Sequence, residues 1–136
     1  MKVLLTITAA IEAGAGLALL VSPSAMARVL LGSSLETRVA LVVARMAGAA
    51  LLALGISCWM ARDDGQSRAA RGVIAAMLVY NAAVVALLAD ARLRSGLSGM
   101  GLWPAVILHS ALAVWCSAGL RARRPASMPQ NLLVET

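Results

Sequence analysis

Charged residues are scarce in this 136-residue sequence, and only 13% of the chain is Asp, Glu, Lys or Arg. A soluble domain normally carries about 25% charged residues, because its surface has to face water. Hydrophobic residues make up 61% of the chain, which exceeds the roughly 45–50% of soluble domains. The shortage of charge argues against a soluble enzyme and a disordered chain, and it predicts an integral membrane protein.

Cysteine, histidine and aromatic residues are also few, and phenylalanine is absent. Cys58 and Cys116 belong to no CxxC motif or Cys/His cluster, so we expect two free thiols and no metal site. The single histidine, His109, has no second axial candidate, which argues against haem. The net charge is +6, but the basic residues are not interleaved with aromatics, which argues against a nucleic-acid partner.

The sequence also has no nucleophile–base pair and no phosphate-binding loop, so it indicates no catalytic residue. What it has instead is four long apolar segments, each about 18–23 residues long. Since about 20 helical residues cross a hydrocarbon core of about 30 Å, each segment predicts a membrane-spanning helix. The expected fold is all-α, an integral membrane four-helix bundle with spans at about 3–21, 39–61, 72–89 and 102–120.

The connections carry the usual signals of helix ends. A short interfacial helix is expected over Pro23–Leu31, capped by Ser22 and ended by Gly32. The segment Ser33–Glu36 has the pattern of a capping box and predicts the start of the second span. Ser67 is the expected cap of the third span.

Residues 1–124 are expected to form the transmembrane domain, and residues 125–136 a loosely ordered cytoplasmic tail. Four spans place both termini on one side of the membrane. Basic residues are more frequent on that side, so the positive-inside rule predicts cytoplasmic termini in a bacterial inner membrane. The residues on that side are Lys2, Arg62, Arg68, Arg71, Arg121, Arg123 and Arg124, against Arg28, Arg38, Arg92 and Arg94 on the other.

Small residues recur at helical spacing and predict close helix–helix contacts, since van der Waals packing drives association in lipid. Three such seams are expected, formed by Ala10, Gly14 and Ala18, by Ala44 and Gly48, and by Gly72 and Ala76.

Five polar residues lie inside the apolar segments: Glu12, Arg45, Tyr80, Asn81 and His109. A charge at the bilayer centre costs at least about 2.5–3.5 kcal/mol, so neither Glu12 nor Arg45 should face lipid. We expect the two to form a buried ion pair between the first two spans. Tyr80, Asn81 and His109 lie at a similar depth and are expected to join them in one polar network.

Three functions are compatible with this network. It could be structural glue in a subunit of a homo-oligomer or a larger membrane complex, although interhelical hydrogen bonds average only about 0.6 kcal/mol. It could instead bind a quinone-like lipid, with Arg45 and His109 donating to the ligand oxygen, in an accessory redox subunit. A small proton-coupled multidrug-type transporter would also need one membrane carboxylate, but an ion pair with Arg45 would hold Glu12 ionised.

A set of short motifs in the first two spans suggests a family. They are Glu12-x-Gly14-x-Gly16-Leu17, Pro23, Leu30-Leu31-Gly32, Ala44-Arg45-Met46-x-Gly48 and Leu54-Gly55. This pattern resembles the DoxX-like group of small bacterial four-helix membrane proteins, over roughly residues 1–62. The resemblance implies a four-helix bundle and an association with quinones or redox processes, and it transfers no catalytic residue.

Overall fold

The computed structural model describes residues 1–64 and 67–121, which form five α-helices. Four of them are long and apolar enough to cross a membrane, as the sequence predicts. The short helix has the predicted bounds, and Gly32 ends it in the left-handed conformation with φ of 77°. The helices are α1 (Lys2–Val21), α2 (Pro23–Leu31), α3 (Arg38–Ala61), α4 (Arg68–Ser95) and α5 (Leu102–Arg121).

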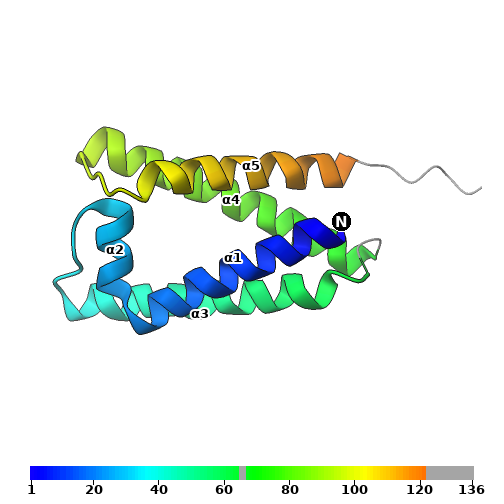
Figure 1. Ribbon diagram of the computed structural model, residues 1–136, viewed down its shortest axis with the longest axis horizontal. Coiled ribbons are helices and arrows are strands. Elements are labelled where there is room, and N and C mark those ends of the chain that lie inside the picture. The colour runs from blue at the N-terminus through cyan, green and yellow to red at the C-terminus, as the bar shows by residue number, and fades with distance from the viewer. Residues whose placement is uncertain (65–66, 122–136) are drawn as a thin grey trace, which may run out of the picture.

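The long helices form two pairs, α1 with α3 and α4 with α5 (Figure 1). Successive long helices run in opposite directions, so Met1 and Arg121 lie at the same end of the molecule. The short helix α2 lies crosswise at the other end, between the two pairs (Figure 1). Consecutive membrane spans have to alternate in direction, and an even number of them brings the start of α1 and the end of α5 to the same end.

The pair α1 and α3 is in close backbone contact through glycines. A Cβ atom added to Gly16 would come within 2.7 Å of the Gly48 carbonyl oxygen, and one added to Gly48 would come within 2.8 Å of the Gly16 carbonyl oxygen. Gly55 is equally confined against Ala13, at 2.9 Å from its nitrogen. The predicted role of Gly48 is confirmed. The seam expected through Gly14 is wrong, because the space around Gly14 is open.

The expected seam on α4 is also wrong, since nothing lies within 4 Å of a Cβ added to Gly72. Periodicity shows which small residues share a helix face, but not which face meets a neighbour. On α1 the contact face contains Gly16, Ala13 and Ala9, not Gly14.

The compact part of the core lies toward the end that holds Met1 and Arg121. It combines the first half of α1 with the end of α3, the start of α4 and the end of α5. Cys58 and Cys116 are both buried there as free thiols, as predicted. The other core members are Leu4, Leu5, Ala9, Ile74, Met77 and Leu112.

Backbone hydrogen bonds join the two helix pairs at the α2 end. The loop between α4 and α5 donates three N–H groups to the last carbonyls of α2, which have no partner within their own helix. Gly99 fits against α2 so closely that an added Cβ would collide with the Val29 carbonyl oxygen. We call this contact the α2–loop latch. Its bonds run from Ser98 to Leu31 at 3.0 Å, from Gly99 to Leu30 at 3.3 Å and from Gly101 to Val29 at 2.8 Å.

Polar contacts also hold the opposite end. Lys2 and Asp63 form an ion pair of 2.8 Å that joins the start of α1 to the turn after α3. The Lys2 ammonium lowers the pKa of the Asp63 carboxyl below its usual value. The Arg71 guanidinium donates to the Leu120 carbonyl oxygen at 3.0 Å, which links α4 to α5.

The predicted helix caps are confirmed in part. The Ser67 hydroxyl accepts from the Ala70 N–H at 3.0 Å and caps α4 as expected. Ser22 precedes α2 but makes no side-chain cap bond. The capping box over Ser33–Glu36 is wrong, because α3 starts later and Thr37 caps it. The tail predicted over residues 125–136 lies outside the described residues.

Candidate functional site: a cavity between the helix pairs

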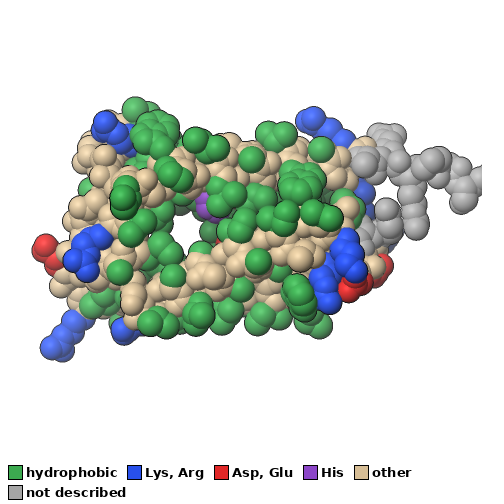
Figure 2. Space-filling model, viewed as in Figure 1, with side chains coloured by type: hydrophobic (Ala, Val, Ile, Leu, Met, Phe, Trp, Pro, Cys, Tyr) green, Lys and Arg blue, Asp and Glu red, His purple; other side chains and the backbone are tan. Residues whose placement is uncertain are grey.

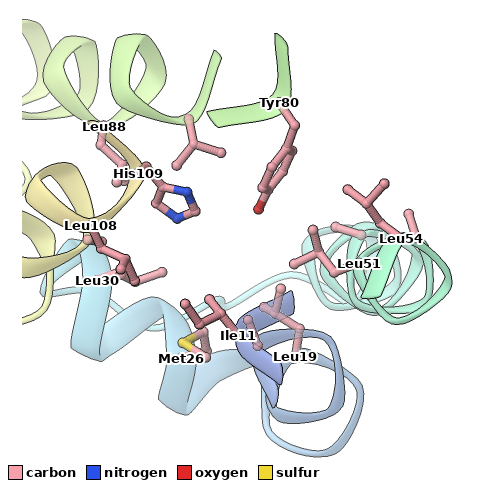
Figure 3. A pocket seen from close by; sticks show the side chains of 15 residues that line it. Ile11, Leu19, Met26, Leu30, Leu51, Leu54, Tyr80, Leu88, Leu108 and His109 are labelled. Atoms are coloured by element: carbon pink, nitrogen blue, oxygen red, sulfur yellow. The ribbon is translucent and has the colours of Figure 1, made fainter. Parts of the chain in front are cut away.

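Tyr80 on α4 and His109 on α5 lie next to each other in the middle of the molecule. Their ring centroids are 5.7 Å apart and the ring planes are inclined by 78°, which is an edge-to-face contact. Both rings are partly buried. Figure 3 shows the His109 ring and the Tyr80 hydroxyl pointing into the same open space. The structure therefore brings these two predicted residues together.

Asn81 supports His109 from within the α4–α5 contact. Its side chain is fully buried, at 0% exposure. The Asn81 Oδ1 lies 2.7 Å from the Nδ1 of His109, and the Asn81 amide nitrogen donates to the Met77 carbonyl oxygen at 2.7 Å. The imidazole is thus held in one orientation by a residue that does not itself line the open space.

Glu12 reaches the same region from α1 and is only 1% exposed. The Tyr80 hydroxyl approaches its carboxyl group, yet neither Glu12 oxygen makes a hydrogen bond to a described residue. The buried Thr8 hydroxyl, one helical turn earlier, has no partner in the described chain either. A buried carboxylate without a counter-charge costs several kcal/mol, so Glu12 in its charged form lowers the stability of the fold.

The predicted ion pair between Glu12 and Arg45 is wrong. Arg45 is exposed, and the Glu12 oxygens have no hydrogen-bond partner in the part of the chain that the structure describes. The physical reason is the contact between Gly16 and Gly48, which brings the backbones of α1 and α3 so close that a guanidinium has no space between them. A long Arg side chain on the outer face can extend toward the polar membrane boundary, which lowers the cost of its charge.

Tyr80 and His109 belong to the wall of a cavity of about 550 Å³ between the two helix pairs. This volume is within the range of about 300–1,000 Å³ that is typical of small-molecule sites. All five helices contribute to the wall, with α2 closing one end through Met26 and Leu30. Figure 2 shows the hollow on this face of the molecule, with the histidine at its edge.

The wall is apolar apart from those two side chains. Of the 15 lining residues, all but Tyr80 and His109 are Ala, Val, Ile, Leu or Met. Ile11 from α1, Leu51 from α3 and Leu108 from α5 lie around the polar pair (Figure 3). An apolar cavity with two convergent polar groups can hold a hydrophobic molecule and orient its polar head.

The sequence analysis thus placed Tyr80, Asn81 and His109 together, but it wrongly included Arg45 and did not predict the apolar wall. Leu51, Leu54 and Leu108 look like any other residues of a membrane helix, so no local signal distinguishes them. The one usable signal was in α2, whose apolar side holds Met26 and Leu30. Within residues 1–64 and 67–121, no group of three or more His, Cys, Asp or Glu side chains could hold a metal ion.

Comparisons of the chain with models of protein families, with curated proteins and with solved structures find no match. The resemblance to the DoxX-like group therefore stays a prediction from the motifs of the first two spans.

Proposed function

We propose that this protein binds a quinone-like lipophilic molecule in the cavity between its helix pairs. The observation that carries the proposal is the combination of an apolar wall with the convergent Tyr80 hydroxyl and His109 imidazole. The ring and chain of such a lipid would bury apolar surface, at roughly 25 cal/mol per Å². Its oxygens would contact Tyr80 and His109. Arg45 is not part of this site.

The position of the cavity supports a ligand that comes from the bilayer. It lies between helices that are apolar enough to span a membrane, and hydrophobic side chains surround the hollow in Figure 2. A lipid could enter sideways between the two helix pairs without crossing water. In this proposal the protein is an accessory redox subunit, and a partner membrane protein exchanges electrons with the bound lipid.

The proposed location is a bacterial inner membrane, with both termini in the cytoplasm. Among described residues, the end with Met1 and Arg121 carries Lys2 and four arginines, against four arginines at the α2 end. The excess is in the direction that the positive-inside rule requires. An Asp64→Cys variant should react with a membrane-impermeant thiol reagent only after the membrane is opened, and Ser98→Cys in intact spheroplasts. The reverse pattern would overturn this orientation.

The binding proposal is tested by mass spectrometry of small molecules that remain with gently extracted protein. Ala50 lines the cavity, so Ala50→Trp should fill it and remove the bound lipid. Its neighbour Ala49 is exposed and does not line the cavity. Ala49→Trp is therefore the matched control and should retain the lipid. Equal lipid content in the two variants, or none in the native protein even after a quinone and the matching hydroquinone are added, would exclude the proposal.

A proton-coupled transporter is a second candidate, and one observation favours it. Glu12 is buried without a hydrogen-bond partner in the described chain and is not paired with Arg45. A carboxyl group in this state is free to exchange a proton, which the predicted ion pair would have prevented. Resistance of cells to lipophilic cations that is lost in Glu12→Gln would support transport. Resistance that does not change in this variant would exclude it.

A further inference from the structure

We infer that the cavity selects the hydroxyl-bearing, reduced form of its ligand, a long-chain hydroquinone, over the oxidised quinone. The inference rests on the proposed function and specifies the chemistry of the ligand head. It follows from the hydrogen bonds of Asn81, which fix the position of the proton on His109.

The contact of Asn81 with Met77 sets the orientation of the Asn81 amide. Its nitrogen lies 2.7 Å from the Met77 carbonyl oxygen, one helical turn earlier on α4. A carbonyl oxygen can only accept, so the group that faces it must be the NH₂ of the amide. The Asn81 oxygen is then the atom that faces His109.

The contact with Asn81 in turn sets the tautomer of His109. The Asn81 Oδ1 lies 2.7 Å from the His109 Nδ1. An amide oxygen has no hydrogen to give, so Nδ1 must carry the hydrogen of this bond. A neutral imidazole has one hydrogen, which leaves Nε2 as a bare acceptor. No described carboxylate forms an ion pair with His109, and the apolar wall disfavours a second proton on the ring.

The other ring nitrogen of His109, Nε2, lies at the open space of the cavity. Nε2 makes no hydrogen bond to a described residue. It is also not one of the fully buried polar atoms that lack a partner, so it is accessible from the cavity. Figure 3 shows the His109 ring extending from α5 into the pocket, with a nitrogen toward the open space. The Tyr80 hydroxyl beside it can both donate and accept. The cavity therefore offers one pure acceptor next to one group of either kind.

A ligand head that matches this pair must supply a donor. A hydroquinone hydroxyl can donate to the His109 Nε2 and accept from the Tyr80 hydroxyl at the same time. A quinone carbonyl can accept from Tyr80 but leaves Nε2 without a partner. An unmatched buried polar group costs about a factor of ten or more in affinity, and sites built for a hydroxyl reject analogues that lack it.

The test compares three probes that share a decyl chain: a hydroquinone, the matching quinone, and the dimethyl ether of the hydroquinone. Their dissociation constants are measured on the full chain in lipid nanodiscs without oxygen. We expect the hydroquinone to bind at least about tenfold more tightly than either of the others. Similar affinities for all three would overturn the inference and leave the proposed function standing. Absence of binding by any of them would overturn the proposed function itself.

Two variants test whether the preference for the hydroquinone depends on the tautomer of His109. His109→Phe removes the acceptor and should make the three affinities similar. Asn81→Leu removes the partner of Nδ1, so the ring is free to place its hydrogen on Nε2, and the preference should fall several-fold. Ser110 is next to His109 but does not line the cavity, so Ser110→Ala is the control and should keep the preference for the hydroquinone. If Asn81→Leu does not fold, His109→Phe alone decides, and an unchanged preference in that variant contradicts the inference.

Discussion

The Nδ1 of His109 and the Oδ1 of Asn81 lie 2.7 Å apart and connect α5 to α4 at the level of the cavity. Because Asn81 is fully buried, this bond is shielded from water and determines how the imidazole enters the cavity. It is one of the few side-chain bonds between the described helices.

The Asn81–His109 bond should also be measurable as a coupling free energy. A double-mutant cycle with Asn81→Ala and His109→Ala should give an interaction of about 0.6–1.7 kcal/mol, the range of interhelical bonds in membrane proteins. Reversible unfolding in detergent measures it. The cycle of Asn81→Ala with Ser110→Ala is the control, and its coupling should be close to zero. A zero value for the His109 cycle would mean that the bond does not form.

Arg45 and Glu12 should behave as independent residues. Arg45→Ala should change the free energy of unfolding by less than about 0.5 kcal/mol, as is usual for exposed positions. Had the two formed a buried ion pair, removing one partner would cost about 3–5 kcal/mol. Glu12→Gln should leave the protein equally or more stable, since it replaces a buried acid without a counter-charge by a neutral amide. A loss of several kcal/mol in the free energy of unfolding of Arg45→Ala would mean that Glu12 and Arg45 do form an ion pair.

Gly16 and Gly14 provide a matched pair on α1. An alanine at Gly16 would meet the backbone of α3, so Gly16→Ala should lose on the order of 1–3 kcal/mol. Gly14 has open space around it, and Gly14→Ala should gain up to about 1 kcal/mol from helix propensity. Thermal unfolding of the two variants should shift in opposite directions. Shifts in the same direction would mean that α1 presents a different face to α3.

The α2–loop latch should control the closed end of the cavity. In Gly99→Ala the new methyl group collides with the Val29 carbonyl oxygen, so the loop must move away from α2. The amides of Ser98 and Gly101 should then exchange their hydrogens faster, since backbone bonds protect them in the latch. Ligand affinity should fall as well, because Met26 and Leu30 of α2 line the cavity. Ser98→Ala keeps the backbone bonds and is the control, with slow exchange expected.

The positions of the helices, and both ends of α2, could be predicted because they depend on local properties. Hydropathy located the four long helices, and Pro23 with Gly32 marked the ends of α2. The prediction for α4 was too short because charged residues lower hydropathy without ending a helix. At its end, Arg94 pairs with Asp90 at 2.9 Å over one turn, and the helix continues to Ser95.

The partners of the polar side chains could be predicted only in part. Position along the predicted helices brought Tyr80, Asn81 and His109 together correctly, because α4 and α5 are adjacent antiparallel helices. The same comparison of positions along two helices failed for Glu12 and Arg45. It gives the height of a residue along a helix but not the distance between two helices at that height.

The sequence by itself therefore determined that the described residues form helices, that four of these are apolar enough for a membrane, and that polar residues lie near the middle of them. The tertiary structure alone decided that α1 and α3 touch through Gly16 and Gly48, which leaves Arg45 outside. It also decided that the two helix pairs separate above a common core and enclose a cavity. Side-chain volume and backbone approach set these features, and both depend on residues far apart in the chain.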